Sequence, residues 1–281
     1  MTLKAATTLI RPINCAMIGF AVIVGEFVSK PSQVPVLNSV FGFLTGFFIC
    51  AYSMVVNDYY DIEVDRVNQP GRPLPSGGIT LQGAYRLSVL MLMAGMAFAV
   101  LTVNIVAVAI AALYAFLSWL YNSRAKKAGL PGNFIVASSL AIPFIYGGVV
   151  SNGSIFNSLL LMMAFTSFFA GVGREVVKAM ADTAGDARRG VKSVAVASGL
   201  NAASRVGAGL FLLAVFTSLV PLFLRLSNLF YEVGVVVPDL IFIYLAVSIL
   251  REPDREKALA VKKTALLGML VGLFVFIGGA L

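Results

Sequence analysis

The chain alternates between long apolar stretches and short polar segments. A helix that crosses a bilayer needs about 20 predominantly apolar residues. Nine stretches approach that length, at residues 12–29, 36–57, 85–103, 105–121, 134–151, 156–176, 204–224, 233–250 and 262–280. Strands of a membrane barrel would alternate polar and apolar positions in shorter segments, which these stretches do not do. The pattern therefore predicts an all-α polytopic membrane protein, with about nine transmembrane helices in one bundle and residues 1–281 forming a single membrane-embedded domain.

The amino-acid composition is typical of a membrane protein and excludes catalytic or metal sites that depend on histidine. Of the 281 residues, 59% are hydrophobic and only 12% are charged, whereas a soluble domain has about 25% charged residues. The chain has no histidine, which excludes histidine acid–base catalysis and histidine metal sites. Cys15 and Cys50 lie within apolar stretches, so we expect them to be packing residues rather than a disulfide or a metal pair.

The placement of the basic residues predicts an orientation. The formal net charge of +8 would suit a nucleic-acid partner if the charges were clustered. With nine helices, however, every Lys and Arg except Lys30 and Arg225 falls at the N-terminus or beside the connections on the same side of the membrane. Positive charge collects on the cytoplasmic side of membrane proteins. We therefore expect a cell-membrane protein with a cytoplasmic N-terminus, an outside C-terminus and no nucleic-acid partner.

An acidic cluster closes the second apolar stretch. Asn57, Asp61 and Asp65 are four residues apart and share one helix face, with Asp58 beside them and Glu63 pointing away. Like charges at this spacing repel one another, and a helix C-terminus disfavours anions. Cations would relieve both penalties, so the cluster indicates a metal site on the cytoplasmic side. The alternative is a simple charged helix end.

A second acidic cluster follows the sixth apolar stretch. Asp182 and Asp186 repeat the spacing of Asp61 and Asp65, and Arg174 and Lys178 share a helix face with Asp182. Alone, this cluster could be a salt-bridged helix end. Together, two carboxylate stripes at one membrane surface suggest an oxygen cage for a divalent cation and the phosphates that it holds. The pair indicates an enzyme that acts on a diphosphate.

Basic and polar residues near the clusters are candidate phosphate ligands. Arg72 lies in the rigid turn Arg-Pro-Leu-Pro-Ser-Gly at 72–77, which would direct it back at the acids as a phosphate clamp. Tyr121 ends the fourth stretch and Lys126 and Lys127 follow it, and Arg11 and Asn14 stand at the start of the first. An asparagine within the bilayer needs a partner. The alternative for these basic residues is that they only set the topology.

Three motifs together resemble the UbiA superfamily of intramembrane prenyltransferases. They are N-D-x-x-D-x-x-x-D at 57–65, R-P-L-P-S-G at 72–77 and R-E-x-x-K-x-x-x-D-x-x-x-D at 174–186. The resemblance extends over the whole chain and is greatest to the archaeal ether-lipid branch, although chlorophyll synthases share much of it. That branch usually has an aspartate directly after the lysine of the last motif, where this chain has Ala179.

The resemblance implies a Mg²⁺-dependent transfer from a polyprenyl diphosphate to a lipophilic acceptor within the membrane. In the ether-lipid branch the donor is geranylgeranyl diphosphate and the acceptor is the sn-2 hydroxyl of geranylgeranylglyceryl phosphate. The catalytic residues would be Asp61, Asp65, Asp182 and Asp186. The metal ligands would be these four aspartates with Asn57 and Asp58. The diphosphate would be bound by Arg72, Tyr121, Lys126, Arg174 and Lys178, and the acceptor by Arg11, Asn14, Lys127 and Lys192.

Three other functions share some features with this sequence, and the sequence argues against two of them. Within the family, the acceptor could be the aromatic ring of a quinone precursor. A transporter would carry acids near the membrane midplane, but the acids here gather at one surface. A CDP-alcohol phosphotransferase would require a D-G-x-x-A-R core, which the chain lacks. Nothing in the sequence indicates an obligate protein partner.

Overall fold

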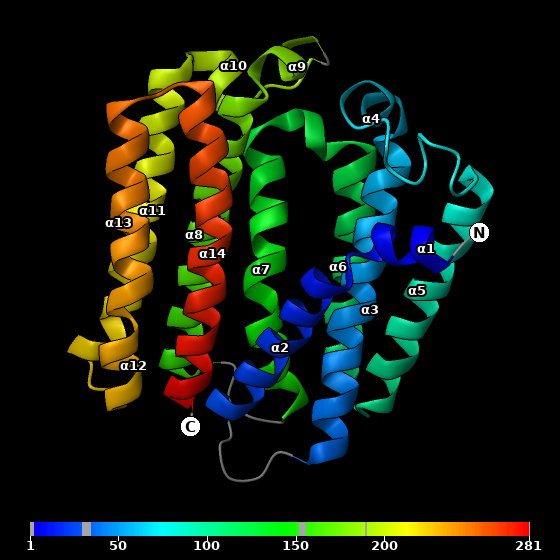
Figure 1. Ribbon diagram of the computed structural model, residues 1–281. Coiled ribbons are helices and arrows are strands. Elements are labelled where there is room, and N and C mark those ends of the chain that lie inside the picture. The colour runs from blue at the N-terminus through cyan, green and yellow to red at the C-terminus, as the bar shows by residue number, and fades with distance from the viewer. Residues whose placement is uncertain (1–2, 30–34, 152–155, 189, 281) are drawn as a thin grey trace.

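The computed structural model describes residues 3–29, 35–151, 156–188 and 190–280; Lys30 lies outside them. Within these ranges the fold is all-α and contains no strand. Nine helical segments of the described chain are long and apolar enough to cross a membrane, which confirms the predicted fold class. The segments stand side by side in one bundle (Figure 1).

The membrane-crossing segments run in chain order. They are α2 (Pro12–Ser29), α3 (Val36–Tyr60), α5 (Leu81–Leu101), α6 (Ile105–Ser123), α7 (Leu130–Val150), α8 (Ser158–Ala181), α10 with α11 (Val194–Ser198, Leu200–Phe223), α12 with α13 (Leu229–Gly234, Val236–Arg251) and α14 (Arg255–Ala280). The shorter helices are α1 (Leu3–Ile10), α4 (Ile62–Asn68), the 3₁₀ turn η1 (Ala125–Ala128) and α9 (Thr183–Arg188). We call the end of the bundle that carries α4, α9 and α10 the motif end (Figure 1).

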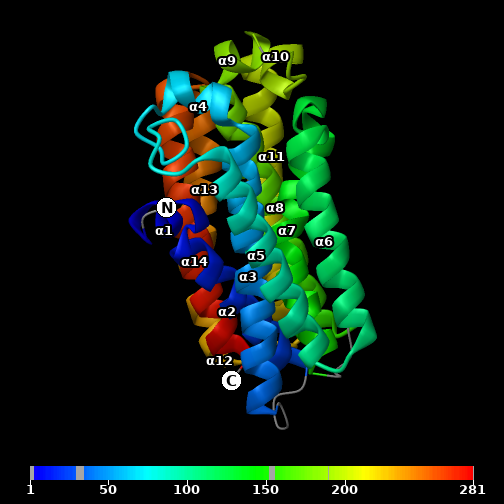
Figure 2. The same ribbon diagram turned by 90° about the vertical axis from the view of Figure 1, so that its right-hand side faces the viewer.

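Packing between helices relies on close backbone approach. The main contacts join α2 to α3 and α7, α3 to α5, α7 to α8, and α8 to α11; Figure 2 shows the same bundle from the side. A Cβ added at Gly25 of α2 would lie 2.0 Å from the Phe144 carbonyl of α7, and one at Gly147 would lie 2.0 Å from the Val22 carbonyl. Lipid chains are as apolar as the helices, so tight packing of this kind is what holds them together.

The first acidic motif spans a bend between two helices. The helix α3 ends at Tyr60, Asp61 adopts a turn conformation, and α4 begins at Ile62. Backbone hydrogen bonds nevertheless continue from Asp61 N–H to Asn57 O and from Asp65 N–H to Asp61 O. The spacing of four residues therefore still brings Asn57, Asp61 and Asp65 to the same side.

The loop that carries Arg72 is anchored to the bundle by apolar side chains. Leu74 and Ile79 are buried in a cluster with Leu9, Val55 and residues of α5. The N–H of Ile79 bonds to Pro73 O, and Gly77 turns the chain with a φ of 77°, which glycine adopts without a Cβ penalty. These anchors fix the loop beside the end of α3.

A second backbone link ties η1 to the segment after α9. The N–H of Lys192 donates to Lys127 O at 3.0 Å. Gly129 has a φ of 72°, and a Cβ there would lie 1.8 Å from Lys192 O, so only glycine permits this approach. The link holds Lys126 at the motif end of the bundle.

Candidate active site

The helices enclose a large cavity that is polar at the motif end and mostly apolar below it, where the hydrogen-bonded pair Ser218 and Asp239 also lines it. Its volume is about 1290 Å³. Residues of both predicted motifs line it at the motif end, namely Asn57, Asp61, Asp65, Arg72, Tyr121, Lys126, Arg174, Lys178 and Asp182. Deeper in the bundle the lining includes Ile49, Leu140, Phe144, Met269 and Phe276. The two sequence motifs, 121 residues apart from Asp61 to Asp182, therefore meet in one space.

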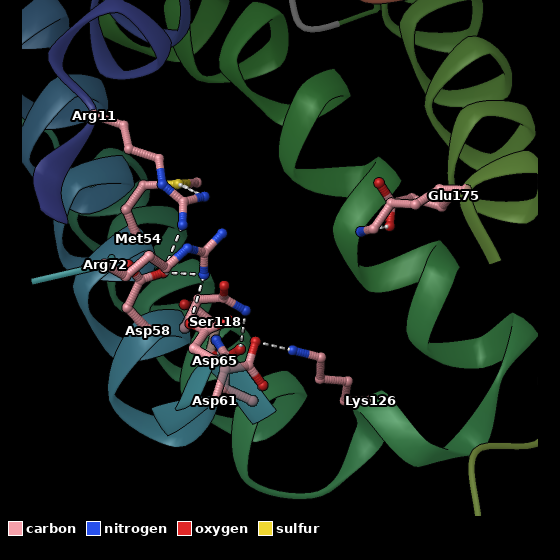
Figure 3. A network of polar contacts seen from close by, with 12 residues as sticks. Arg11, Met54, Asp58, Asp61, Asp65, Arg72, Ser118, Lys126 and Glu175 are labelled. Carbon is pink, nitrogen blue, oxygen red and sulfur yellow. Dashed lines mark hydrogen bonds and ion pairs between the residues drawn. The ribbon is translucent and has the colours of Figure 1, made fainter. Parts of the chain in front are cut away.

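The carboxylates of the first motif are each paired with a cation. Arg11 Nη2 lies 2.5 Å from Asp58 Oδ1, and Arg72 Nη1 lies 2.6 Å from Asp65 Oδ2 and 3.4 Å from Asp58 Oδ1. Lys126 donates to Asp61. The Asp58 side chain is only 3% exposed, and a buried carboxylate requires such compensation. Figure 3 shows the three aspartates side by side with these cations around them.

Asn57 is oriented by a neighbouring helix. Its Nδ2 donates to Asn122 Oδ1 of α6 at 2.8 Å, and Asn122 Nδ2 donates to Ser118 O at 2.9 Å. This chain of hydrogen bonds uses the amide nitrogen of Asn57 and leaves its Oδ1 as an acceptor on a residue that lines the cavity. Oxygen acceptors are the ligands that hard cations prefer.

The opposite wall of the cavity is formed by α8. The Glu175 carboxylate is 6% exposed and is held by Arg174 at 3.1 Å and Lys178 at 2.6 Å. Figure 3 shows Glu175 across the opening from the aspartates of α3 and α4. Asp182 follows the last residue of α8, is exposed and lines the cavity. Glu175 therefore fixes two of the cations that sequence reasoning assigned to the diphosphate.

The oxygen donors suit a hard divalent cation in their chemistry. Asn57, Asp61, Asp65 and Asp182 line the same cavity, and carboxylate and amide oxygens are typical ligands of Mg²⁺. Across the described residues, no three acidic or cysteine side chains are already gathered closely enough to hold a metal ion. Instead, Lys126 and Arg72 occupy the neighbourhood of Asp61 and Asp65. The donor set fits the ion, and the paired cations balance the donors' charge.

Several predicted residues lie outside the lining of this cavity. Asp58 is buried between two arginines, and Asp186 is buried on α9. Lys127 and Lys192 are exposed at the linked connections described above. Glu63 also lies outside the lining, with its side chain 75% exposed and paired with Arg66.

Of the residues predicted to bind the acceptor, Arg11 and Asn14 do line the cavity.

Sequence patterns did not identify several polar residues of the cavity, among them Asn122, Arg255 and Lys262. Asn122 lies near the end of α6, just before a charged connection. The residues around it in the sequence do not reveal its contact with Asn57, which lies on another helix. Arg255 and Lys262 of α14 line the cavity at the motif end. They belong to a connection of mixed charge that reads as a solvated turn. The signal that could have found them is their spacing, since residues seven apart share a helix face.

Comparisons with known proteins agree with this architecture. Residues 18–277 match the UbiA prenyltransferase family. The digeranylgeranylglyceryl phosphate synthase of Methanocaldococcus jannaschii is 35% identical over 279 residues, which is 99% of this chain and 97% of that protein. A solved structure described as giving insight into digeranylgeranylglyceryl phosphate synthase in membranes superposes with a TM-score of 0.80. It has 35% identity and covers 99% and 98% of the two chains.

A more distant solved structure shares the fold. It is a UbiA homologue from Archaeoglobus fulgidus bound to GPP and Mg²⁺, with a TM-score of 0.69. It is 18% identical and covers 98% of this chain and 99% of its own.

Proposed function

The chain belongs to the UbiA prenyltransferase family, and we propose that it is the geranylgeranyl transferase that completes a digeranylgeranylglyceryl phosphate. The donor is geranylgeranyl diphosphate, and the acceptor is the sn-2 hydroxyl of geranylgeranylglyceryl phosphate. Support comes from the relatives named digeranylgeranylglyceryl phosphate synthase, at 35% identity over nearly the full length. The chain is a multi-pass membrane prenyltransferase.

The observation that carries the proposal is the division of one cavity into a polar end and an apolar body. A prenyl diphosphate has the same division, with an anionic head on an apolar chain. The motif end offers cations and oxygen donors for the head, and the helices below offer apolar walls for the chain. Those walls also keep water from an allylic cation after the diphosphate leaves.

The residues of the polar end act on the leaving group. Asn57, Asp61, Asp65 and Asp182 line the cavity and would hold Mg²⁺, and Asp58 and Asp186 complete the acidic motifs. When bound, the ion offsets the negative charge that grows on the diphosphate as the allylic C–O bond breaks. Arg72, Lys126, Arg174 and Lys178 supply further positive charge at that place, with Tyr121 beside them. The oxygen of the acceptor hydroxyl then forms the new ether bond with the allylic carbon, and its proton passes to the released diphosphate.

The topology proposal follows from charge placement. The basic residues collect beside the motif end, which we therefore assign to the cytoplasmic face of the cell membrane. The N-terminus would then be cytoplasmic and the C-terminus outside. Cysteine accessibility at the two ends of the bundle in intact cells would test this orientation.

One competition assay tests the proposed function. Purified protein is given geranylgeranyl diphosphate and Mg²⁺ with equal amounts of geranylgeranylglyceryl phosphate and 4-hydroxybenzoate. We expect the doubly prenylated glycerol phosphate as the product, diphosphate release in equal amount, and loss of both with EDTA. Prenylated 4-hydroxybenzoate as the main product would replace the proposal with the aromatic alternative.

A further inference from the structure

The polar end of the cavity holds unequal charge on its two walls. On the wall formed by α3, α4 and their neighbours, three carboxylates face three cations in ion pairs. On the wall formed by α8 and α14, four cations line the cavity with two carboxylates; these residues are Arg174, Lys178, Arg255, Lys262, Glu175 and Asp182. The second wall therefore carries surplus positive charge and favours an additional anion.

The surplus resides on α14. Both carboxylate oxygens of Glu175 are already bonded, to Arg174 and Lys178. Lys262 is attracted electrostatically to Glu175 but has no ion pair within 4 Å in the described part of the chain. Arg255 uses its Nε to bond to Ala181 O at 3.2 Å, and its two Nη groups have no partner within the described ranges. The Nε of Arg174 is buried and also has no partner there.

An apolar track continues from these cations down the same face of α14. The side chains that line the cavity are spaced alternately four and three residues apart, at Arg255, Leu259, Lys262, Leu266, Met269, Leu273 and Phe276. This spacing keeps all of them on one helix face. From Lys262 to Phe276 the helix rises about 21 Å, a length that suits an extended chain of four isoprene units. The face thus presents a cationic head and an apolar tail in series.

We propose that this face of α14 binds the acceptor, with Lys262 and Arg255 holding a phosphate monoester on the glycerol and the apolar track holding its prenyl chain. The inference rests on the proposed function and adds the residues that select a phosphorylated acceptor. It places the acceptor phosphate at the two cations of α14 and leaves the metal and the diphosphate between the paired wall and the α8 residues Arg174, Lys178 and Asp182. Lys127 and Lys192 then have no part in binding, because they lie outside the cavity lining.

Paired acceptors and paired variants test the proposal. The acceptors are geranylgeranylglyceryl phosphate and geranylgeranylglycerol, which differ only in the phosphate. The variants are Lys262→Met, Lys262→Arg, Arg255→Met and the control Lys263→Met, which removes a charge from the neighbouring exposed position outside the cavity lining. The KM of each acceptor is measured at saturating geranylgeranyl diphosphate, and the KM of the donor at a saturating acceptor.

We expect Lys262→Met to raise the KM of the phosphorylated acceptor by about tenfold to a hundredfold, the effect of one lost charged hydrogen bond. Arg255→Met changes the same KM in the same direction, and Lys262→Arg restores most of the affinity. The KM of the donor and the KM of geranylgeranylglycerol stay close to those of the unaltered protein. In Lys263→Met, all three KM values stay close to those of the unaltered protein.

Two results would overturn the inference. One is a Lys262→Met variant that matches Lys263→Met with the phosphorylated acceptor. The other is an equal loss with both acceptors or a raised donor KM, which would assign the cations to the diphosphate. Failure of the proposed function looks different, because the unaltered protein would then make no ether product from either glycerol.

Discussion

Asn57 and Asn122 are joined by a 2.8 Å hydrogen bond between side chains from two different helices. Asn122 accepts this bond with Oδ1 and is itself fixed by its donation to Ser118 O. The bond orients the Asn57 amide so that its oxygen stays available on a residue that faces the cavity. Groups that orient a metal ligand are worth a considerable part of its affinity.

The variant Asn122→Leu should therefore raise the Mg²⁺ requirement. Without the hydrogen-bond acceptor on Asn122, the Asn57 amide is free to rotate, and its oxygen is no longer held in the orientation for binding a metal ion. We expect the Mg²⁺ concentration for half-maximal rate to rise by roughly tenfold to a hundredfold, with the maximal rate partly recovered at high Mg²⁺. The measurement is the rate of diphosphate release across a Mg²⁺ series.

Ser123→Ala is the matched control for that series. Ser123 is the next residue of α6, and its hydroxyl donates to Leu120 O at 3.4 Å. Its Mg²⁺ curve should overlay that of the unaltered protein. An Asn122→Leu curve that also overlays would show that the orientation of Asn57 is irrelevant to the metal.

Lysine is expected to replace Arg72 only in part. Its Nη1 contacts both Asp58 and Asp65, and its other guanidinium N–H groups are further donors that a lysine ammonium lacks when a phosphate binds. We expect kcat/KM to fall by about a hundredfold in Arg72→Met and by about tenfold in Arg72→Lys. Initial rates of ether formation measure both. Arg66→Met, which removes an exposed arginine paired with the exposed Glu63, should retain normal rates.

The aspartates of the two motifs should be needed for turnover but not for folding. Asp61→Ala and Asp182→Ala each remove an oxygen donor from the cavity, so we expect at least a hundredfold loss of rate. Expression and membrane insertion should stay normal, because neither residue belongs to the apolar contacts between helices. Glu63→Ala is the acidic control from the exposed side of the motif. Near-normal rates in Asp61→Ala or Asp182→Ala would contradict the metal site.

The membrane-spanning helices were predictable because a helix that faces lipid must be built from a long run of apolar residues. At several ends the helices continue beyond the predicted stretches into the charged segments. The stretch 262–280 corresponds to α14 from Arg255, seven residues earlier, and 134–151 corresponds to α7 from Leu130. The start of α14 does carry a local signal, since Asp254 accepts from Lys257 N–H as a helix cap.

Only the part of the site that lies within the sequence motifs was predictable. The i,i+4 spacing placed Asn57, Asp61 and Asp65 on one side of the chain, and the structure keeps that arrangement through the bend at Asp61. Contacts between helices were out of reach, because the Asn57–Asn122 bond depends on how α3 packs against α6. The position of Lys262 in the cavity likewise depends on how α14 packs against α8.

The close approach of α2 and α7 gives a test of the bundle itself. A methyl group at position 25 would lie 2.0 Å from the Phe144 carbonyl, which is backbone and cannot rotate away. Gly25→Ala should therefore separate the two helices at a cost of roughly 1–3 kcal/mol, read as a lower apparent Tm in detergent. Gly209→Ala on α11 meets nothing within 4 Å and should leave the Tm unchanged or raise it, because alanine favours helix more than glycine. Equal melting of the two variants would mean that α2 and α7 are not in tight contact in the membrane protein.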